Sequence, residues 1–422
     1  MQLKEIAKAD NRYFLILCVM GAFAILGSTM SKSPVLNPFA KSLGTPSDLL
    51  GLVAAASTIP GILISLPAAS LSDVIGRRKV LLFSAFVFAS APFLYLFVGT
   101  WWQLALVRFY HGFATAVFVP VTEATVAERF PTKRGERISI LNSVTGIGRM
   151  VAPTLGGGIL AFYTLPSGFI RSAGFQTLYL AVGVAGVTAF VLAFLLLSEK
   201  KKPTVQSAGA KSVTLKMFQG WRDVVRSRGA LVVSFVQAAQ YYVYGAMEFF
   251  IVGYMIDVAK LDALFAGVFL TVQVATIIIA RPVLGRLSDK KGRRTPIVAG
   301  SLISCLLLFA VPFTTQFPIL LLIAVGYGLG FAMAISSTSP LMSELAPTGL
   351  VGSSMGFLCT MMDAGQTLGP IVSGVILASV FGYTGLFASL GVLLIVSAGV
   401  FALSKTAKPK PQTASTETPC DA

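Results

Sequence analysis

Long apolar stretches separated by short polar connections fill almost the whole chain. Most of these stretches hold roughly 20 or more mostly apolar residues, enough for a helix to cross the hydrocarbon core of a bilayer. The pattern predicts twelve spanning helices, near residues 13–34, 48–72, 79–98, 102–128, 137–163, 174–197, 230–256, 263–288, 295–313, 317–343, 350–379 and 384–403.

Two longer polar segments divide the predicted spans. Residues 199–229 separate the sixth span from the seventh, and residues 405–422 follow the twelfth. The first segment has the polar composition of a linker, and the second that of a disordered tail. The sequence therefore predicts an all-α membrane protein, with one six-helix bundle over residues 1–198 and another over residues 230–404.

The basic residues gather in alternate connections. With a cytoplasmic N-terminus, 26 of the 33 Lys and Arg residues lie in cytoplasmic segments, four lie in outer segments and three lie inside spans. The positive-inside rule then predicts that both termini, the linker and the tail are cytoplasmic. Because the chain is 55% hydrophobic and only 12% charged, its net charge of +16 reflects this orientation in a bilayer and not a nucleic-acid partner.

The connection after the second span returns after the eighth. Residues 69–79 read ASLSDVIGRRK and residues 285–294 read GRLSDKKGRR. At an offset of 216 residues, Asp73, Gly76, Arg77 and Arg78 recur as Asp289, Gly292, Arg293 and Arg294, and Glu128 recurs as Glu344. A register kept at separate sites indicates a duplication, so the two bundles should be pseudo-symmetric.

This repeat closely resembles the signature of the major facilitator superfamily, G-x-L-a-D-r-x-G-r-k, between the second and third helices. The resemblance covers the whole chain, with Ala69 where Gly is usual. It implies that Asp73 binds the N-terminus of helix 11 and Asp289 that of helix 5. The resulting hypothesis is a latch between the halves, closed when the protein opens outward; a loop staple without a switching role is the alternative. The latch residues are Asp73, Gly76, Arg77, Arg78, Asp289, Gly292 and Arg293.

Two further motifs of the same family lie in the fourth and fifth spans. Residues 104–112 resemble motif B, with Arg108 at its arginine and His111 where Gln is usual. An arginine in a spanning helix is costly, so Arg108 should face the protein interior. The fifth span resembles motif C, which in this superfamily marks antiporters; its residues are Gly148, Pro153, Gly156 and Gly157. The eleventh span repeats this motif, which leaves inherited helix packing as the alternative to antiport.

Charged and titratable residues inside spans are functional candidates by default. They are Arg108, His111, Glu123, Arg149, Glu248, Arg281 and Asp363. In the seventh span, Tyr241, Tyr244 and Glu248 recur at steps of three and four and share one helix face, which suits an amphiphilic ligand. The predicted substrate site comprises Gln237, Gln240, Tyr241, Tyr244, Glu248 and Arg149. The predicted proton-coupling residues are Asp363, Glu248, Arg108, His111 and Glu123, with a permanent ion pair of Asp363 to Arg149 or Arg108 as the alternative.

These features favour a secondary transporter of the drug/proton antiporter type, a monomer in the cell membrane that exports small amphiphilic organic molecules. A proton symporter that takes up an organic anion or metabolite is one alternative, and a non-pumping lipid-handling or sensor protein on the same fold is another. The four Cys are scattered and there is one His, so neither a metal site nor a cofactor is expected. An enzyme is not expected, because no nucleotide loop and no nucleophile with a base is found.

Overall fold

The computed structural model describes residues 2–64, 72, 76–131, 133–165, 170–196, 224, 226–346 and 350–404. Within these ranges the protein is almost entirely helical and contains no strand; Thr164 and Ile170 form only an isolated bridge. The N-terminal half contains α1 (Gln2–Met30), α2 (Leu36–Ser42), α3 (Leu50–Ala55), α5 (Arg77–Tyr95), α6 (Trp101–Arg129), α7 (Arg134–Phe162) and α8 (Ser172–Leu196). The C-terminal half contains α10 (Arg228–Asp257), α11 (Ala263–Lys291), α12 (Arg294–Ala310), a 3-10 turn (Val311–Phe313), α13 (Phe317–Leu345), α14 (Val351–Ala378) and α15 (Gly382–Leu403).

Two predicted spans are interrupted. The first was predicted over residues 13–34, with a bend or stop at Pro34 and Pro38; α1 ends earlier, at Met30, and a turn leads into the short helix α2. The second is broken by a turn over residues 56–58, just before Pro60. A proline ring removes one backbone donor and crowds the carbonyl four residues earlier, which accounts for the break at that point.

Eight of the helices in the described ranges are long and apolar enough to cross a membrane. The chain is therefore a multi-pass membrane protein, while the predicted count of twelve spans and the orientation of the termini stay predictions. The long helices α7, α10 and α14 are not among the eight, and each carries one of the charged residues Arg149, Glu248 and Asp363. These three charged residues, which lower the hydropathy of their helices, are residues of the candidate site.

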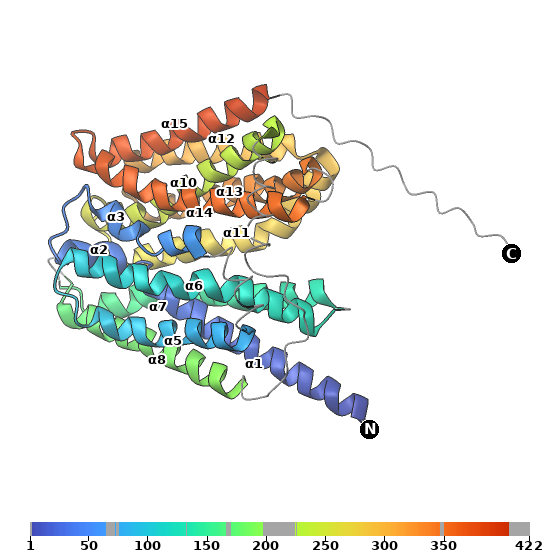
Figure 1. Cartoon of the computed structure of the whole chain (residues 1–422). Helices are drawn as coiled ribbons and strands as arrows, with labels where there is room; N and C mark the ends of the chain where they lie inside the picture. The colour runs from blue at the N-terminus through green and yellow to red at the C-terminus, as the bar shows by residue number, and fades with distance from the viewer. Residues whose placement is uncertain are drawn as a thin grey trace.

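The helices pack as two groups (Figure 1). In the N-terminal half α1 packs on α7 and α8, and α5 packs on α6 and α8; in the C-terminal half α10 packs on α14, and α13 packs on α11 and α12. The halves meet through α7 with α11, α3 with α14, and α2 with α10. We call the end that holds α2 and α3 the closed end, and the opposite end, where α1 begins and α15 finishes, the open end.

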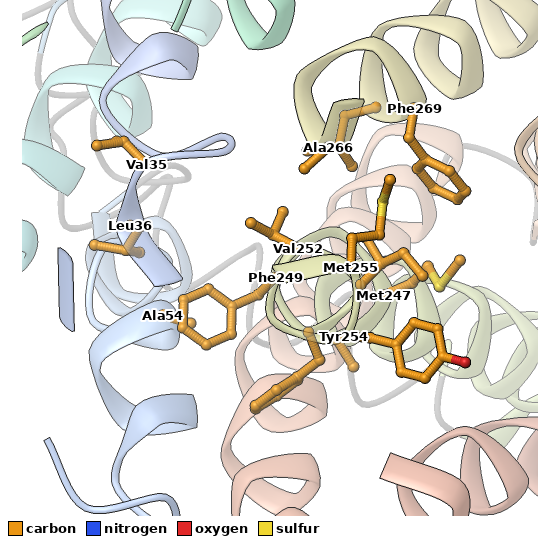
Figure 2. Close-up of a cluster of buried hydrophobic side chains, with 14 of the residues drawn as sticks. Val35, Leu36, Ala54, Met247, Phe249, Val252, Tyr254, Met255, Ala266 and Phe269 are labelled. Carbon is orange, nitrogen blue, oxygen red and sulfur yellow. The ribbon is translucent and has the colours of Figure 1, made fainter. Parts of the chain in front are cut away.

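A buried apolar cluster crosses the boundary between the halves at the closed end. Figure 2 shows Phe249 of α10 pointing toward Ala54 and Leu36 of the N-terminal half. All three side chains are buried. Closing this end therefore removes apolar surface of both halves from solvent, which stabilises the contact.

Candidate functional site

Two ion pairs join the halves at the closed end. Lys32, after α1, places its Nζ 2.6 Å from Oε2 of Glu248 on α10, and the Ser33 hydroxyl donates to Oε1 of the same carboxylate at 2.8 Å. Nearer the surface Lys41 pairs with Asp257, which also accepts a hydrogen bond from the Tyr383 hydroxyl at 2.7 Å. The side chains of Lys32 and Glu248 are only 19% and 12% exposed, so this inner pair is largely shielded from water.

Each of these pairs joins residues 216 positions apart. This is also the offset of the sequence repeat, so Lys32 and Glu248 occupy equivalent positions of the two halves, as do Lys41 and Asp257. Equivalent positions can touch each other only beside the pseudo-two-fold axis that relates the halves. Both ion pairs therefore lie at this axis.

The aromatic face predicted on the seventh span exists on α10. The Tyr244 ring stacks on Phe331 of α13 at 4.9 Å between centroids, and the Tyr241 ring meets Phe331 edge-on at 5.4 Å. Both tyrosines are half-buried, and the charge of Glu248 acts on Tyr244. The rings and the carboxylate thus form one continuous surface.

The two predicted amide groups lie elsewhere. The Gln237 side-chain oxygen accepts a hydrogen bond from Thr338 of α13 at 2.6 Å, and the Gln240 amide donates to Ser301 of α12 at 2.8 Å. Both glutamines are buried inside the C-terminal half. Their positions assign them to helix packing, so we remove them from the substrate site.

Arg149 of α7 and Arg281 of α11 are exposed. Their helices, α7 and α11, pack on each other, and α11 also packs on α10 and α13, which carry the aromatic face. The predicted alternative, an ion pair between Asp363 and Arg149 or Arg108, is not formed in the described structure.

Two carboxylates face a different part of the boundary. Asp363 of α14 is half-buried beside Gly61, where a Cβ would lie 3.4 Å from its Oδ2. Glu123 of α6 accepts a hydrogen bond from the Asn142 amide at 3.0 Å. Glu123 lies on α6 of the N-terminal half and Asp363 on α14 of the C-terminal half, which also carries the exposed Cys359, so each half contributes one acid.

Arg108 faces the protein interior, as predicted. It is 2% exposed and donates to the Ser57 hydroxyl at 2.5 Å and to the Ala54 carbonyl at 3.4 Å. Ser57 lies within the break of the second span and Ala54 just before it, so Arg108 binds groups at this break. His111 is buried within the N-terminal half, 3.4 Å from the Tyr95 hydroxyl. Neither side chain is at the boundary between the halves.

The motif C residues hold α7 between two neighbours. A Cβ at Gly148 would lie 2.8 Å from the carbonyl oxygen of Ala22 on α1, and one at Gly156 would lie 3.2 Å from Met30. On the opposite side a Cβ at Gly157 would lie 2.3 Å from the Ala263 carbonyl oxygen. A Cβ at Gly267 of α11 would likewise lie 2.3 Å from the Pro153 carbonyl oxygen. Gly157 and Pro153 thus serve the contact between the halves.

The two copies of the latch motif make matching contacts. Arg77 donates to Glu128 at 2.7 Å and to Ser72 at 3.0 Å. The equivalent Arg293 donates to Glu344 at 3.0 Å and to Ser288 at 3.3 Å, and it also pairs with Asp289. The intervening glycines, Gly76 and Gly292, have φ angles of +100° and +84°, a region that disfavours side chains.

The two predicted latch contacts between the halves, of Asp73 with α14 and of Asp289 with α7, stay predictions. Arg78 is exposed. Asp73 lies outside the described residues. Asp289 pairs with Arg293 of its own motif copy.

Comparisons with known proteins agree on one family. The model of the Major Facilitator Superfamily matches residues 14–357 and 249–419. The riboflavin transporter RibZ of Clostridioides difficile is 24% identical over 71% of this chain and 73% of its own. The quinolone resistance protein NorA of Staphylococcus aureus is 22% identical over 40% of this chain and 42% of its own. Among solved structures, an inward-facing bacterial homologue of the human lysosomal transporter Spinster superposes with a TM-score of 0.77 at 15% identity, over 93% of this chain and 96% of that one.

Proposed function

This chain belongs to the major facilitator superfamily, whose members are transporters and not enzymes, and we propose that it exports small amphiphilic organic molecules in exchange for protons. The proposed topology places twelve spans in the cell membrane, with both termini and the open end in the cytoplasm. In this orientation the closed end faces outward, and the protein is an inward-open monomer.

The observation that carries this proposal is the state of Glu248. Its carboxylate is bound by Lys32 and Ser33 of the other half, so the bond exists only while the closed end is shut. When the halves rock and this end opens, the carboxylate loses its cation in a poorly solvated place. A carboxylate in such surroundings takes up a proton from the outer side, and it releases that proton when Lys32 returns.

Asp363 is suited to bind a proton while the open end is shut and to release it when that end opens to the cytoplasm. It forms no ion pair within the described structure and lies toward the open end, near Glu123 of the other half. Two carboxylates brought together when the open end shuts would favour one shared proton. The latch residue Asp73 would act in the same step by binding the N-terminus of α14.

The choice of drug export over uptake is supported by the motif C match in α7 and by the similarity to a quinolone resistance protein. The symporter alternative predicts inward flux of the organic molecule along with protons, and the non-pumping alternative predicts no flux. All three are separable in one assay.

The test uses the full chain in proteoliposomes with an imposed proton gradient and a fluorescent quinolone as the probe. We expect proton-driven quinolone movement against the direction of proton flow. Glu248→Gln and Asp363→Asn should abolish the gradient-driven flux while leaving quinolone binding intact. Asp262→Asn is the matched control, because Asp262 only caps α11 and its amide variant keeps an oxygen for the Leu264 backbone amide. Full gradient-driven flux in both site variants would refute the coupling scheme.

A further inference from the structure

Arg149 and Arg281 differ from Lys32 and Arg108, two other basic residues of the candidate site. Lys32 is bound by Glu248, and Arg108 donates to Ser57. Neither Arg149 nor Arg281 makes a hydrogen bond or an ion pair with any described residue. An unpaired guanidinium at membrane depth is costly unless it meets water or an anion.

Their positions bring the two arginines to the same surface. The helices α7 and α11 run side by side, joined by a hydrogen bond between the Thr154 and Thr271 hydroxyls of 2.7 Å. Arg149 lies roughly 8 Å of helix from Thr154 and Arg281 roughly 15 Å from Thr271, both toward the open end. The helix α11 also packs on α13 and α10, which carry the aromatic rings, so the arginines and the rings belong to one group of packed helices.

The neighbouring surface is aromatic. Tyr241, Tyr244 and Phe331 form one cluster of rings, with Tyr244 stacked on Phe331. Guanidinium groups bind carboxylate, sulfonate or phosphate through paired N–H donors, and flat rings bind flat apolar bodies. We propose that Arg149 and Arg281 bind the acidic group of an organic anion whose flat apolar body lies against Tyr241, Tyr244 and Phe331.

This assignment rests on the proposed transport function and names its substrate class. The remaining charges of the boundary orient the ligand. Asp363 and Glu123 repel an acidic group, so the anionic end must lie at the α7–α11 side and a basic end, where present, can face the two acids.

The same geometry explains how the anion would be released. While the closed end is shut, Lys32 neutralises Glu248, and Arg149 stays available to the ligand. When that end opens, Glu248 loses Lys32, and until it takes up its proton the free carboxylate competes with the ligand for Arg149. The protein therefore binds the anion more tightly in the inward-open form than in the outward-open form.

The experiment measures binding to the purified full chain by calorimetry, with three probes that share one ring system: 2-naphthoate, 2-naphthamide and 2-naphthylmethylammonium. We expect the carboxylate to bind roughly tenfold or more tightly than the amide, as a charge-assisted pair would give. Arg149→Gln and Arg281→Gln should each reduce this preference, and Arg149→Lys should keep part of it. Arg171→Gln, at an exposed arginine outside the predicted spans, should leave it unchanged.

Equal binding of carboxylate and amide, preference for the ammonium probe, or no carboxylate binding at millimolar concentration would overturn the anion site. So would an unchanged preference in both Gln variants. Proton-driven quinolone flux that persists in those cases would leave the transport function standing. An Arg149-dependent preference without any proton-driven flux would instead reject the transport function and keep the site.

Discussion

Removing the charge of Lys32 should shift the protein toward the outward-open form, in which the closed end has opened and the open end has shut. In Lys32→Gln the Glu248 carboxylate keeps its bond to Ser33 but loses the 2.6 Å contact to Nζ. A hydrogen bond to a charged group contributes about 1.5–3 kcal/mol, and this pair is largely shielded from water. Since about 1.4 kcal/mol is a factor of ten, the ratio of the two forms should change by roughly 10- to 100-fold.

The outer pair should matter less. The side chains of Lys41 and Asp257 are 29% and 38% exposed. Exposed pairs typically contribute about 0.2–1 kcal/mol, so Lys41→Gln should change the ratio by no more than about five-fold. The two lysines thus provide an internal comparison of a shielded and a solvated pair on the same axis.

Cys359 provides the assay. It is exposed on α14 toward the open end, whereas Cys18 and Cys305 are buried. In a background with Cys420→Ser, the rate of maleimide labelling therefore reports access to Cys359. We expect slower labelling in Lys32→Gln, because shutting the open end brings α6 over this position.

The controls separate charge from folding. Lys260→Gln changes an exposed lysine of the same end that forms no ion pair within the described structure, and it should label like the parent. Exchanging the partners, Lys32→Glu with Glu248→Lys, should restore part of the parent rate, since the two positions are equivalent about the axis. An unchanged labelling rate in a well-folded Lys32→Gln protein would refute the claim that this pair holds the closed end.

Two further predictions concern packing and orientation. Gly157→Ala should abolish transport because its Cβ would lie 2.3 Å from the Ala263 carbonyl oxygen, whereas Gly158→Ala, with no atom nearer than 3.9 Å, should be tolerated; equal flux in both variants would contradict the role given to this contact. Reporters fused at Gln206 and at the C-terminus should both be cytoplasmic, since 26 of the 33 basic residues lie on that side, and an external signal from either reporter would exclude the proposed topology.

Most helix limits could be predicted because an apolar stretch of spanning length leaves few alternatives. The predicted 102–128 is α6, Trp101–Arg129, and the predicted 384–403 is α15, Gly382–Leu403. The breaks after Met30 and after Ala55 could not be placed from hydropathy, because the apolar character continues through both turns. The positions of Pro34 and Pro60 were the available signals.

The aromatic face was predictable and its extent was not. Helical spacing places Gln237 on the same face as Glu248, but α13 covers that face at the depth of Gln237, as its bond to Thr338 shows. Helical spacing shows which side chains share a face of the helix, but it does not show which neighbouring helix covers that face. Lys32 was missed as a partner of Glu248, although the offset of 216 residues already marked the two positions as equivalent.

The duplication explains why some residue pairs stayed alike and others became opposite. Arg77 with Glu128, and Arg293 with Glu344, each lie within one half, so both copies can keep the same residues. A position beside the axis meets its own equivalent, as position 32 meets position 248. Two lysines or two glutamates there would repel each other, so closing this end requires that the copies diverge to opposite charges. Once they differ, the lysine of one half neutralises the carboxylate of the other half only while the closed end is shut. Because the carboxylate has a cation in one form and none in the other, a proton or an organic anion can bias the transition between the two forms.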